Sequence, residues 1–200
     1  MIDEWIQRGR QKRLLVHSLE RPLTFREIRD EILRIDPDSP VQLRDIWLLT
    51  KKMEMCGLMR CVSDSKEATG KVYALTEKGK NIVLQVYGRR VIPDPEGIAW
   101  NEYGWIARAK ARREVLIEFE RKDRESPDTA WRACDIRKSI NVRYPMGYRD
   151  VLGIINELLA HRMIENSETK GRSKLYRITK DGQKIARIMQ RTPELNPDSP

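Results

Sequence analysis

Three segments in the first half of the chain carry apolar residues at helical spacing, with polar residues between them. They cover residues 12–19, a stretch that begins at Thr24, and residues 40–56. The pattern therefore predicts three amphipathic helices in succession. The faces that we expect to be buried are Leu15, Val16 and Leu19, then Ile28, Ile32 and Leu33, then Leu43, Ile46, Leu49 and Met53.

Residues typical of helix ends mark where these helices begin and stop. Thr24 is followed three residues later by Glu27, which is the spacing of a capping box. Ser39 precedes Pro40, and this pair predicts an N-cap followed by proline at the first helical position. Gly57 follows the third segment, so we expect it to end that helix in a left-handed conformation.

A hairpin and a final helix are predicted to follow. Two short strands, LMRCV from Leu58 and KVYAL from Lys71, flank the polar turn SDSKEATG. Thr76, with Gly79 soon after it, then begins a helix that runs to about Tyr87. The predicted order is three helices, two strands and a closing helix.

The second half of the chain repeats this pattern. Residues 39–61 align with residues 144–166 at an offset of 105, and the hairpin segments from Lys71 and Lys174 align at an offset of 103. Arg44 and Asp45 recur as Arg149 and Asp150. In this copy we expect helices over 108–122, 131–140, 145–161 and 180–190, strands over 163–166 and 175–179, and an inward face at Val115, Leu116 and Phe119.

The repeat predicts two domains, 1–88 and 108–191, with a tail over 192–200 that we expect to be disordered. Between them, residues 89–107 contain prolines followed by Trp100, Tyr103 and Trp105. A free linker seldom carries three large aromatic residues, so we expect them to pack against one or both domains. Peptide binding or base stacking by these side chains is the alternative.

Three helices followed by a hairpin are the plan of the winged helix-turn-helix. The sequence therefore predicts a mainly α, α+β fold of two tandem winged-helix domains. VYALTEKG (from Val72) and GRSKLYRITKDG (from Gly171) also resemble the wing and final-helix entry of the PadR and MarR families of regulators. That resemblance implies a DNA-binding winged helix, although those regulators usually carry one such domain per chain.

The charge of the chain bears on the kind of partner that it binds rather than on its fold. The net charge is +9, with +5 in residues 1–90 and +4 in residues 91–200, so the basic excess belongs to both halves. A shared basic excess on a folded chain favours a polyanionic partner, although ordinary solubility is the plainer interpretation. No apolar run is long enough for a membrane span, and the charged N-terminus lacks a signal core, so we expect a cytoplasmic, nucleoid-associated protein.

Catalytic and metal chemistry are not predicted. The chain has no phosphate-binding loop and no nucleophile motif, so we expect neither an enzyme nor a cofactor. Cys56, Cys61 and Cys134 form no C-x-x-C pair, and His17 and His161 lie far apart, so we expect no metal site. We expect the three thiols to be reduced and mostly buried.

The long third helix of each copy, about 40–56 and 145–161, is the candidate recognition helix. Gln can pair with adenine and Arg with guanine by two hydrogen bonds. For Arg44 and Arg149, a structural ion pair to the second helix is the alternative, and Tyr144 and Tyr148 can instead cover the core. The candidate contacts are Gln42, Arg44, Lys51 and Lys52 in the first copy and Arg143, Tyr148, Arg149 and Asn156 in the second.

The hairpin turns are candidate phosphate contacts. The second turn carries Lys170, Arg172 and Lys174 around a glycine, whereas the first carries Lys66 and Lys71 among acidic residues. We therefore expect the two domains to contribute unequally.

Three functions fit this pattern. The first is a sequence-specific transcriptional regulator that binds double-stranded DNA through two recognition helices. The second is a structural protein that binds other proteins or itself, as tandem winged helices do in segregation and condensation protein B, in endosomal sorting subunits and in polymerase accessory subunits. The third is a replication initiator of plasmid type. The sequence does not separate the third from the first.

Overall fold

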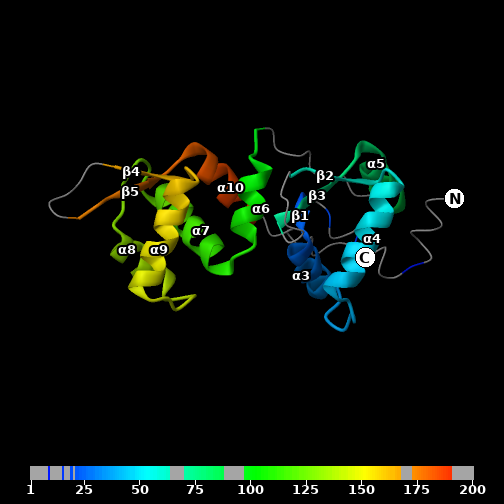
Figure 1. The fold of residues 1–200 in the computed structure, drawn as a ribbon, viewed down its shortest axis with the longest axis horizontal. Helices are drawn as coiled ribbons and strands as arrows, with labels where there is room; N and C mark the ends of the chain where they lie inside the picture. Colours follow the sequence, from blue (N-terminus) through cyan, green and yellow to red (C-terminus); the bar gives the residue numbers. More distant parts are fainter. Residues whose placement is uncertain are drawn as a thin grey trace. The chain divides into compact units, whose positions relative to one another are not determined.

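The computed structural model describes residues 9, 15, 19, 21–63, 70–87, 97–167 and 173–190. The chain divides into two compact units, Met1–Arg108 and Ala109–Pro200 (Figure 1). The described residues form a mainly helical α+β structure with eight helices and two small antiparallel sheets. No helix among these residues has both the length and the apolar character that crossing a membrane requires.

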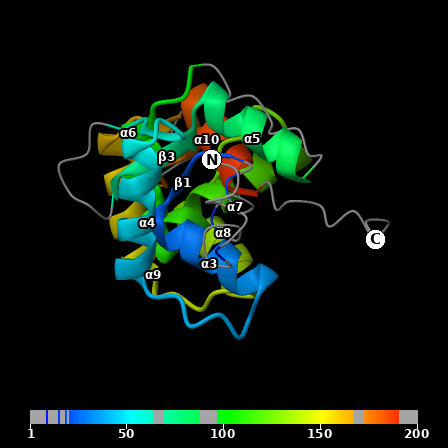
Figure 2. The same cartoon turned by 90° about the vertical axis from the view of Figure 1, so that its right-hand side faces the viewer.

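The first unit contains α3 (Phe25–Ile35), α4 (Leu43–Met55), α5 (Glu77–Tyr87) and α6 (Trp100–Ala107). Its three-stranded sheet has the order β1 (Leu23–Thr24), β3 (Val72–Leu75), β2 (Met59–Cys61). Helices α3 and α4 contact each other, and their inner faces close over the core (Figures 1 and 2). Leu15 and Leu19 are fully buried in that core, while the rest of the helix predicted over 12–19 lies outside the described residues.

The second unit is arranged around α7 (Lys110–Glu125), which contacts α8 (Ala133–Ile140), α9 (Tyr148–Ala160) and α10 (Lys180–Gln190). Its hairpin pairs β4 (Ile164–Asn166) with β5 (Tyr176–Ile178). The predicted inward residues of α7, Val115, Leu116 and Phe119, are at most 1% exposed. The predicted tail over 192–200 lies outside the described residues.

The capping box predicted for α3 is confirmed. The backbone N–H of Glu27 donates to Thr24 Oγ1, and the Glu27 carboxylate accepts from the backbone N–H of Thr24 at 2.9 Å. These reciprocal bonds satisfy two N–H groups that a helix start would otherwise leave open. The start of α3 is therefore fixed by its own sequence.

The start predicted for the third helix of each copy is wrong by three residues. Pro40 lies before α4, which begins at Leu43 with Gln42 as its N-cap, and α9 begins at Tyr148 rather than Pro145. The cause is an aspartate in the first turn: Asp45 Oδ2 accepts the N–H of Gln42 at 3.1 Å. Its counterpart Asp150 accepts the N–H of Gly147 at 3.2 Å. A carboxylate at the third helical position satisfies the N–H of the N-cap residue, and so it stabilises a start at Leu43 in α4 and at Tyr148 in α9.

Each copy also contains a short strand segment that the sequence pattern missed. In the first unit Leu23 pairs with Tyr73 across β1 and β3. In the second unit Trp131, at the position equivalent to Leu23, forms an isolated bridge with Tyr176. Both segments lie just before the second helix of their copy. The order within each copy is therefore strand, helix, helix, strand, strand, helix, with a preceding helix described in the second unit.

The two long helices end in the same hydrogen-bond pattern. After α4, Leu58 N–H donates to Met53 O and Gly57 N–H donates to Glu54 O, which is a Schellman motif. Met163 and Arg162 make the equivalent bonds after α9. Gly57 has φ of 70°, and Arg162 has φ of 57°. The second copy therefore places a side chain in a conformation that favours glycine.

We expect Arg162→Gly to stabilise the second unit, because glycine adopts the left-handed conformation at no steric cost. The gain is about 0.5–1 kcal/mol after the larger backbone entropy of glycine in the unfolded chain is counted. Gly57→Ala is the matched opposite change and should destabilise the first unit by about 1 kcal/mol. Urea unfolding of the full chain measures both. A loss of stability in Arg162→Gly would contradict the assignment.

In each unit, hydrogen bonds of a threonine hydroxyl connect a glycine in the first turn of the closing helix to the end of the preceding long helix. Thr76 Oγ1 donates to Gly57 O at 2.7 Å and accepts the Gly79 N–H at 3.2 Å. In the second unit Thr179 Oγ1 lies 2.9 Å from Arg162 O and accepts the Gly182 N–H at 3.1 Å. In each unit the hairpin runs between the end of the long helix and the start of the closing helix, which these hydrogen bonds hold together. The base of the hairpin therefore has a fixed position beside the long helix.

Trp100, Tyr103 and Trp105 of the segment 89–107 were predicted to pack against one or both domains. They lie in α6, which belongs to the first unit. Tyr103 is fully buried there, and its hydroxyl donates to Glu27 Oε1 at 2.6 Å and accepts from Arg21. Burial, followed by the neighbouring Glu27 carboxylate, raises the pKa of Tyr103 well above its usual value. Trp100 packs edge-on against the Tyr103 ring at 5.5 Å. Tyr103 thus joins α6 to α3.

Candidate nucleic-acid interface

The outer face of α4 carries one arginine and two lysines. Arg44 lies in the first turn and is exposed, and it makes no ion pair within the described part of the chain. Lys51 follows two helical turns later on the same face, where it pairs with Glu54 at 2.6 Å and lies over the Tyr73 ring. Lys52 is exposed. Gln42 is exposed at the N-cap, beside Arg44.

The outer face of α9 is more polar. Arg149 and Asn156 lie seven residues apart, and therefore on one side of the helix, and both are exposed. Gly153 lies between them, and a Cβ at that position would meet no atom within 4 Å. Tyr148 is 45% exposed at the helix start, so it does not close the core. The middle of this face therefore allows a ligand to approach the backbone.

The neighbouring aspartates do not neutralise these arginines. The alternative predicted for the Arg–Asp pairs was an ion pair to the second helix. Instead, Asp45 and Asp150 each accept a backbone N–H at the start of their own helix. Arg149, like Arg44, has no ion pair within the described residues. The equivalent arginine of each copy is thus left available to an outside anion.

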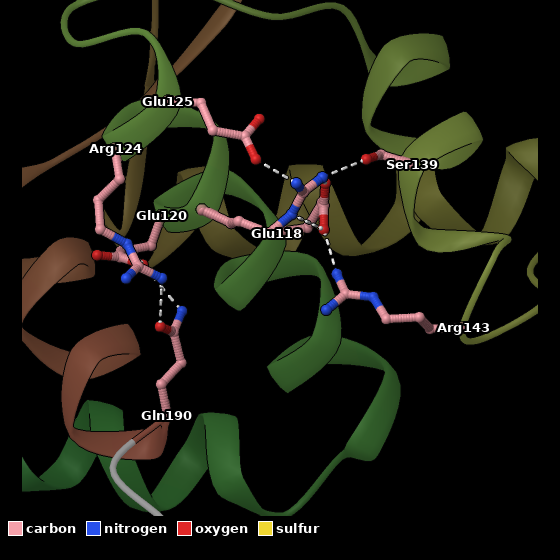
Figure 3. A network of polar contacts seen from close by, with 8 residues as sticks. Glu118, Glu120, Arg124, Glu125, Ser139, Arg143 and Gln190 are labelled. Atoms are coloured by element: carbon pink, nitrogen blue, oxygen red, sulfur yellow. Dashed lines mark hydrogen bonds and ion pairs between the residues drawn. The ribbon is translucent and has the colours of Figure 1, made fainter.

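The turn that precedes α9 is held by a buried carboxylate (Figure 3). Glu118 of α7 is fully buried and pairs with Arg121 and with Arg143, a residue of that turn. Arg121 also donates to Ser139 Oγ of α8 at 2.6 Å. Arg143, a candidate DNA contact, is therefore engaged in the protein, although 51% of its side chain stays exposed. The ion pair of Arg143 with Glu118 positions the start of α9.

A second buried carboxylate ties α10 to α7. Glu120 is fully buried and pairs with Arg124 and with Arg187, each at 3.0 Å. Gln190 Nε2 donates to the same carboxylate at 2.9 Å, and Arg124 donates to Gln190 Oε1 (Figure 3). Buried charges are costly unless they are paired in this way. The two networks make α7 the element that positions α8, α9 and α10.

We expect Glu118→Gln to destabilise the second unit by about 2 kcal/mol at neutral pH, because charged hydrogen bonds are lost. Burial raises the pKa of Glu118, but hydrogen bonds from Arg121 and Ser139 and the arginine charges outweigh it, so the net pKa is lowered. Its contribution is therefore present above the pKa of the unfolded chain and disappears as pH falls through the lowered folded value.

Urea unfolding between about pH 7 and pH 3 tests this expectation. The wild-type chain should lose the Glu118 contribution on acidification, so the difference in the free energy of unfolding between wild type and Glu118→Gln should become smaller. A difference that stays constant over this range would show that ionisation of Glu118 does not stabilise the fold.

The hairpins are described only at their bases. Lys71 is partly buried just before β3, and Lys174 is exposed just before β5. The remaining predicted hairpin contacts, Lys66, Lys170 and Arg172, lie outside the described residues. Tyr144, predicted either to contact DNA or to cover the core, is partly buried and lies beneath Lys110, whose Nζ is 5.2 Å from the ring centroid.

The sequence reasoning missed an apolar patch on α4. Leu43 was predicted to be buried but is 40% exposed, because the helix starts at this residue and its first turn extends past the core. Trp47, one turn later, is 44% exposed. The spacing of four residues between them was the available signal. Together they border a groove of about 350 Å³, here called the Trp47 groove, that is lined by Thr24, Phe25, Arg26, Leu43, Arg44, Trp47 and Arg108.

The cysteines follow the prediction in part. All three are free, but each is only partly buried, because two lie at the edges of α4 and β2 and one lies in the first turn of α8.

Comparison of the chain with protein-family models and with curated proteins finds no match.

Proposed function

We propose that the protein binds double-stranded DNA through two tandem winged-helix domains. The element order of each unit fits this fold: a strand segment, two helices and a hairpin with a closing helix. In such folds the second of those helices enters the major groove and the hairpin reaches the adjacent backbone. Helices α4 and α9 occupy that place in the two units.

One observation carries the proposal. Arg44 and Arg149 occupy equivalent positions in the first turn of these helices, both are exposed, and the aspartate next to each is used as a helix cap. The N-terminal turns of a recognition helix are where base edges are reached. A duplicated guanidinium that makes no ion pair within the described residues suits the paired acceptors of guanine or a backbone phosphate.

The proposed biological role is sequence-specific regulation of transcription. A chain with two recognition helices supplies what most helix-turn-helix proteins obtain by forming a dimer. Because the exposed faces of α4 and α9 differ, the two half-sites should differ in sequence. A replication initiator would use the same contacts on repeated sites.

Selection from a pool of random duplexes tests this role. The full chain should enrich duplexes that contain two unequal half-sites separated by about one helical turn or a multiple of it. Enrichment of one short half-site would limit specific binding to one unit. Recovery of an unchanged random pool would remove the case for sequence-specific regulation.

Protein binding is the second candidate function, and the exposed apolar side chains of α4 favour it. Besides Leu43 and Trp47, Leu48 is 42% exposed and Met55 is 88% exposed. Recognition of DNA needs few such side chains, whereas the centres of protein interfaces are enriched in Trp and Met. The α9 face has no comparable apolar set among the described residues.

A further inference from the structure

The Trp47 groove combines an apolar floor with a basic rim. Phe25, which is 7% exposed, forms the floor together with Leu43 and Trp47. The Phe25 ring stacks on Tyr73 at 4.8 Å, so the floor rests on the rigid core of the first unit. Its volume falls within the range of ordinary small-ligand sites. A preformed apolar hollow of this kind fits one or two bulky side chains.

Three arginines surround this floor. Arg26 comes from the first turn of α3, Arg44 from the first turn of α4, and Arg108 follows α6. Arg26 Nη1 donates to the backbone carbonyl of Arg108 at 3.1 Å, which brings two of the three together. None of the described residues that line the groove is acidic. Guanidinium groups in such a rim bind carboxylates through paired hydrogen bonds.

The second unit does not repeat this arrangement. The positions equivalent to Phe25 and Arg26 are Ala133 and Cys134, and the position equivalent to Trp47 is Leu152. The remaining fold of the repeat is nevertheless retained, down to the helix caps and the threonine–glycine hydrogen bonds of the closing helices. The groove is therefore a feature of the first unit and is not needed by the fold itself.

We infer that the Trp47 groove binds a short segment of a partner protein in which a bulky apolar side chain is flanked by Asp or Glu. The apolar side chain fills the space over Phe25 and Trp47, and the carboxylates pair with Arg26 and Arg44 of the rim. This inference is independent of DNA binding by α9. Because Arg44 belongs to both surfaces, the segment should compete with DNA at the first unit only.

Charge and shape argue against the other occupants. A DNA duplex offers phosphates to the rim but no side chain that fills an apolar hollow, so binding would leave the floor hydrated. A second copy of this chain carries a net charge of +9, and its approach to an arginine rim is electrostatically unfavourable. An acidic segment with an apolar residue satisfies both parts of the groove.

Panning a displayed library of random short peptides on the full chain tests the inference. Panning is carried out without DNA, because DNA would compete for Arg44, and moderate salt weakens non-specific binding to the other basic surfaces. The enriched peptides are then synthesised for titration. We expect enrichment of sequences that place Leu, Phe or Trp beside Asp or Glu. Trp47→Ala and Arg26→Ala should each weaken binding of such a peptide by about tenfold or more, as losses at the centre of an interface do.

Matched controls separate this groove from the rest of α4. Met55→Ala removes an exposed apolar side chain, and Lys52→Ala removes a charge, in both cases outside the groove. Both variants should bind the peptide as the wild type does. Thermal unfolding checks that the half-exposed Trp47 position tolerates alanine, and Arg26→Glu supplies a variant that leaves the apolar floor intact.

Three results would overturn the inference. The first is enrichment of peptides that lack either the apolar or the acidic residue. The second is a loss of DNA affinity in Trp47→Ala without any peptide that binds the groove, which would assign this surface to nucleic acid. The third is self-association of the chain that Trp47→Ala abolishes. Failure of DNA binding in the wild type would contradict the proposed function but would leave peptide binding intact.

Discussion

Gly182→Ala should destabilise the second unit by about 3 kcal/mol, the upper range for an overpacked site. A Cβ at this position would lie 2.1 Å from Met163 O and 2.9 Å from Ile178 Cγ1. Met163 O already accepts the Thr179 N–H, so the carbonyl cannot turn away without breaking the link between the hairpin and α10. The substitution must therefore displace α10 from β4.

Two glycines provide the comparison. Gly153 is helical and faces open space, so Gly153→Ala should raise stability by about 0.5–1 kcal/mol through helix propensity alone. Gly79→Ala should reproduce the Gly182 effect in the first unit, because its Cβ would lie 2.2 Å from Leu58 O. Urea unfolding of the full chain measures all three variants. Equal effects of Gly153→Ala and Gly182→Ala would contradict this account of the closing helix.

Arg149→Ala should reduce affinity for a preferred duplex by about 1–3 kcal/mol, or roughly fivefold to 150-fold. The reason is that the guanidinium is exposed in the first turn of α9, without an ion pair in the described structure. Asn156 lies on the same face of α9, so Arg149 and Asn156 together form a candidate binding surface that extends for two helical turns. The Arg44→Ala change should act in the same direction at the other half-site.

Conservative and remote variants identify the kind of contact. Arg149→Lys keeps the charge but loses the paired donor geometry, so it should restore affinity only if the contact is to phosphate. Lys184→Ala removes one charge from α10, away from the candidate surface, and should change affinity little. Fluorescence anisotropy with a labelled duplex gives these values. An Arg149→Ala variant that binds like the Lys184→Ala variant would remove α9 from the interface.

The sequence predicted most of the elements because apolar spacing and capping residues act locally. The capping box of Thr24 and Glu27, and the helix over 180–190, follow directly from such signals. The two-residue strand β1 was missed because a segment of that length has no detectable alternation. It exists because Leu23 pairs with Tyr73, a partner fifty residues away in the chain.

The candidate site was less predictable, because exposure depends on where a helix starts and what packs beside it. The apolar spacing placed Leu43 in the core, but the Asp45 cap moves the helix start to Leu43 and leaves that residue half-exposed. Arg143 could not be assigned to Glu118 from sequence, since twenty-five residues separate them. The exposure of Arg44 and Arg149 followed correctly from their positions opposite the buried face.

Titration of the full chain onto random-sequence duplex DNA at two salt concentrations tests DNA binding most directly. Neutralisation of about four phosphates predicts that affinity falls about a hundredfold between roughly 50 and 200 mM salt. The Arg44→Ala, Arg149→Ala double variant should bind more weakly and show a shallower salt dependence if these arginines contact phosphate. Absence of binding by the wild-type chain at the lower salt concentration would contradict the proposal that this protein acts on DNA.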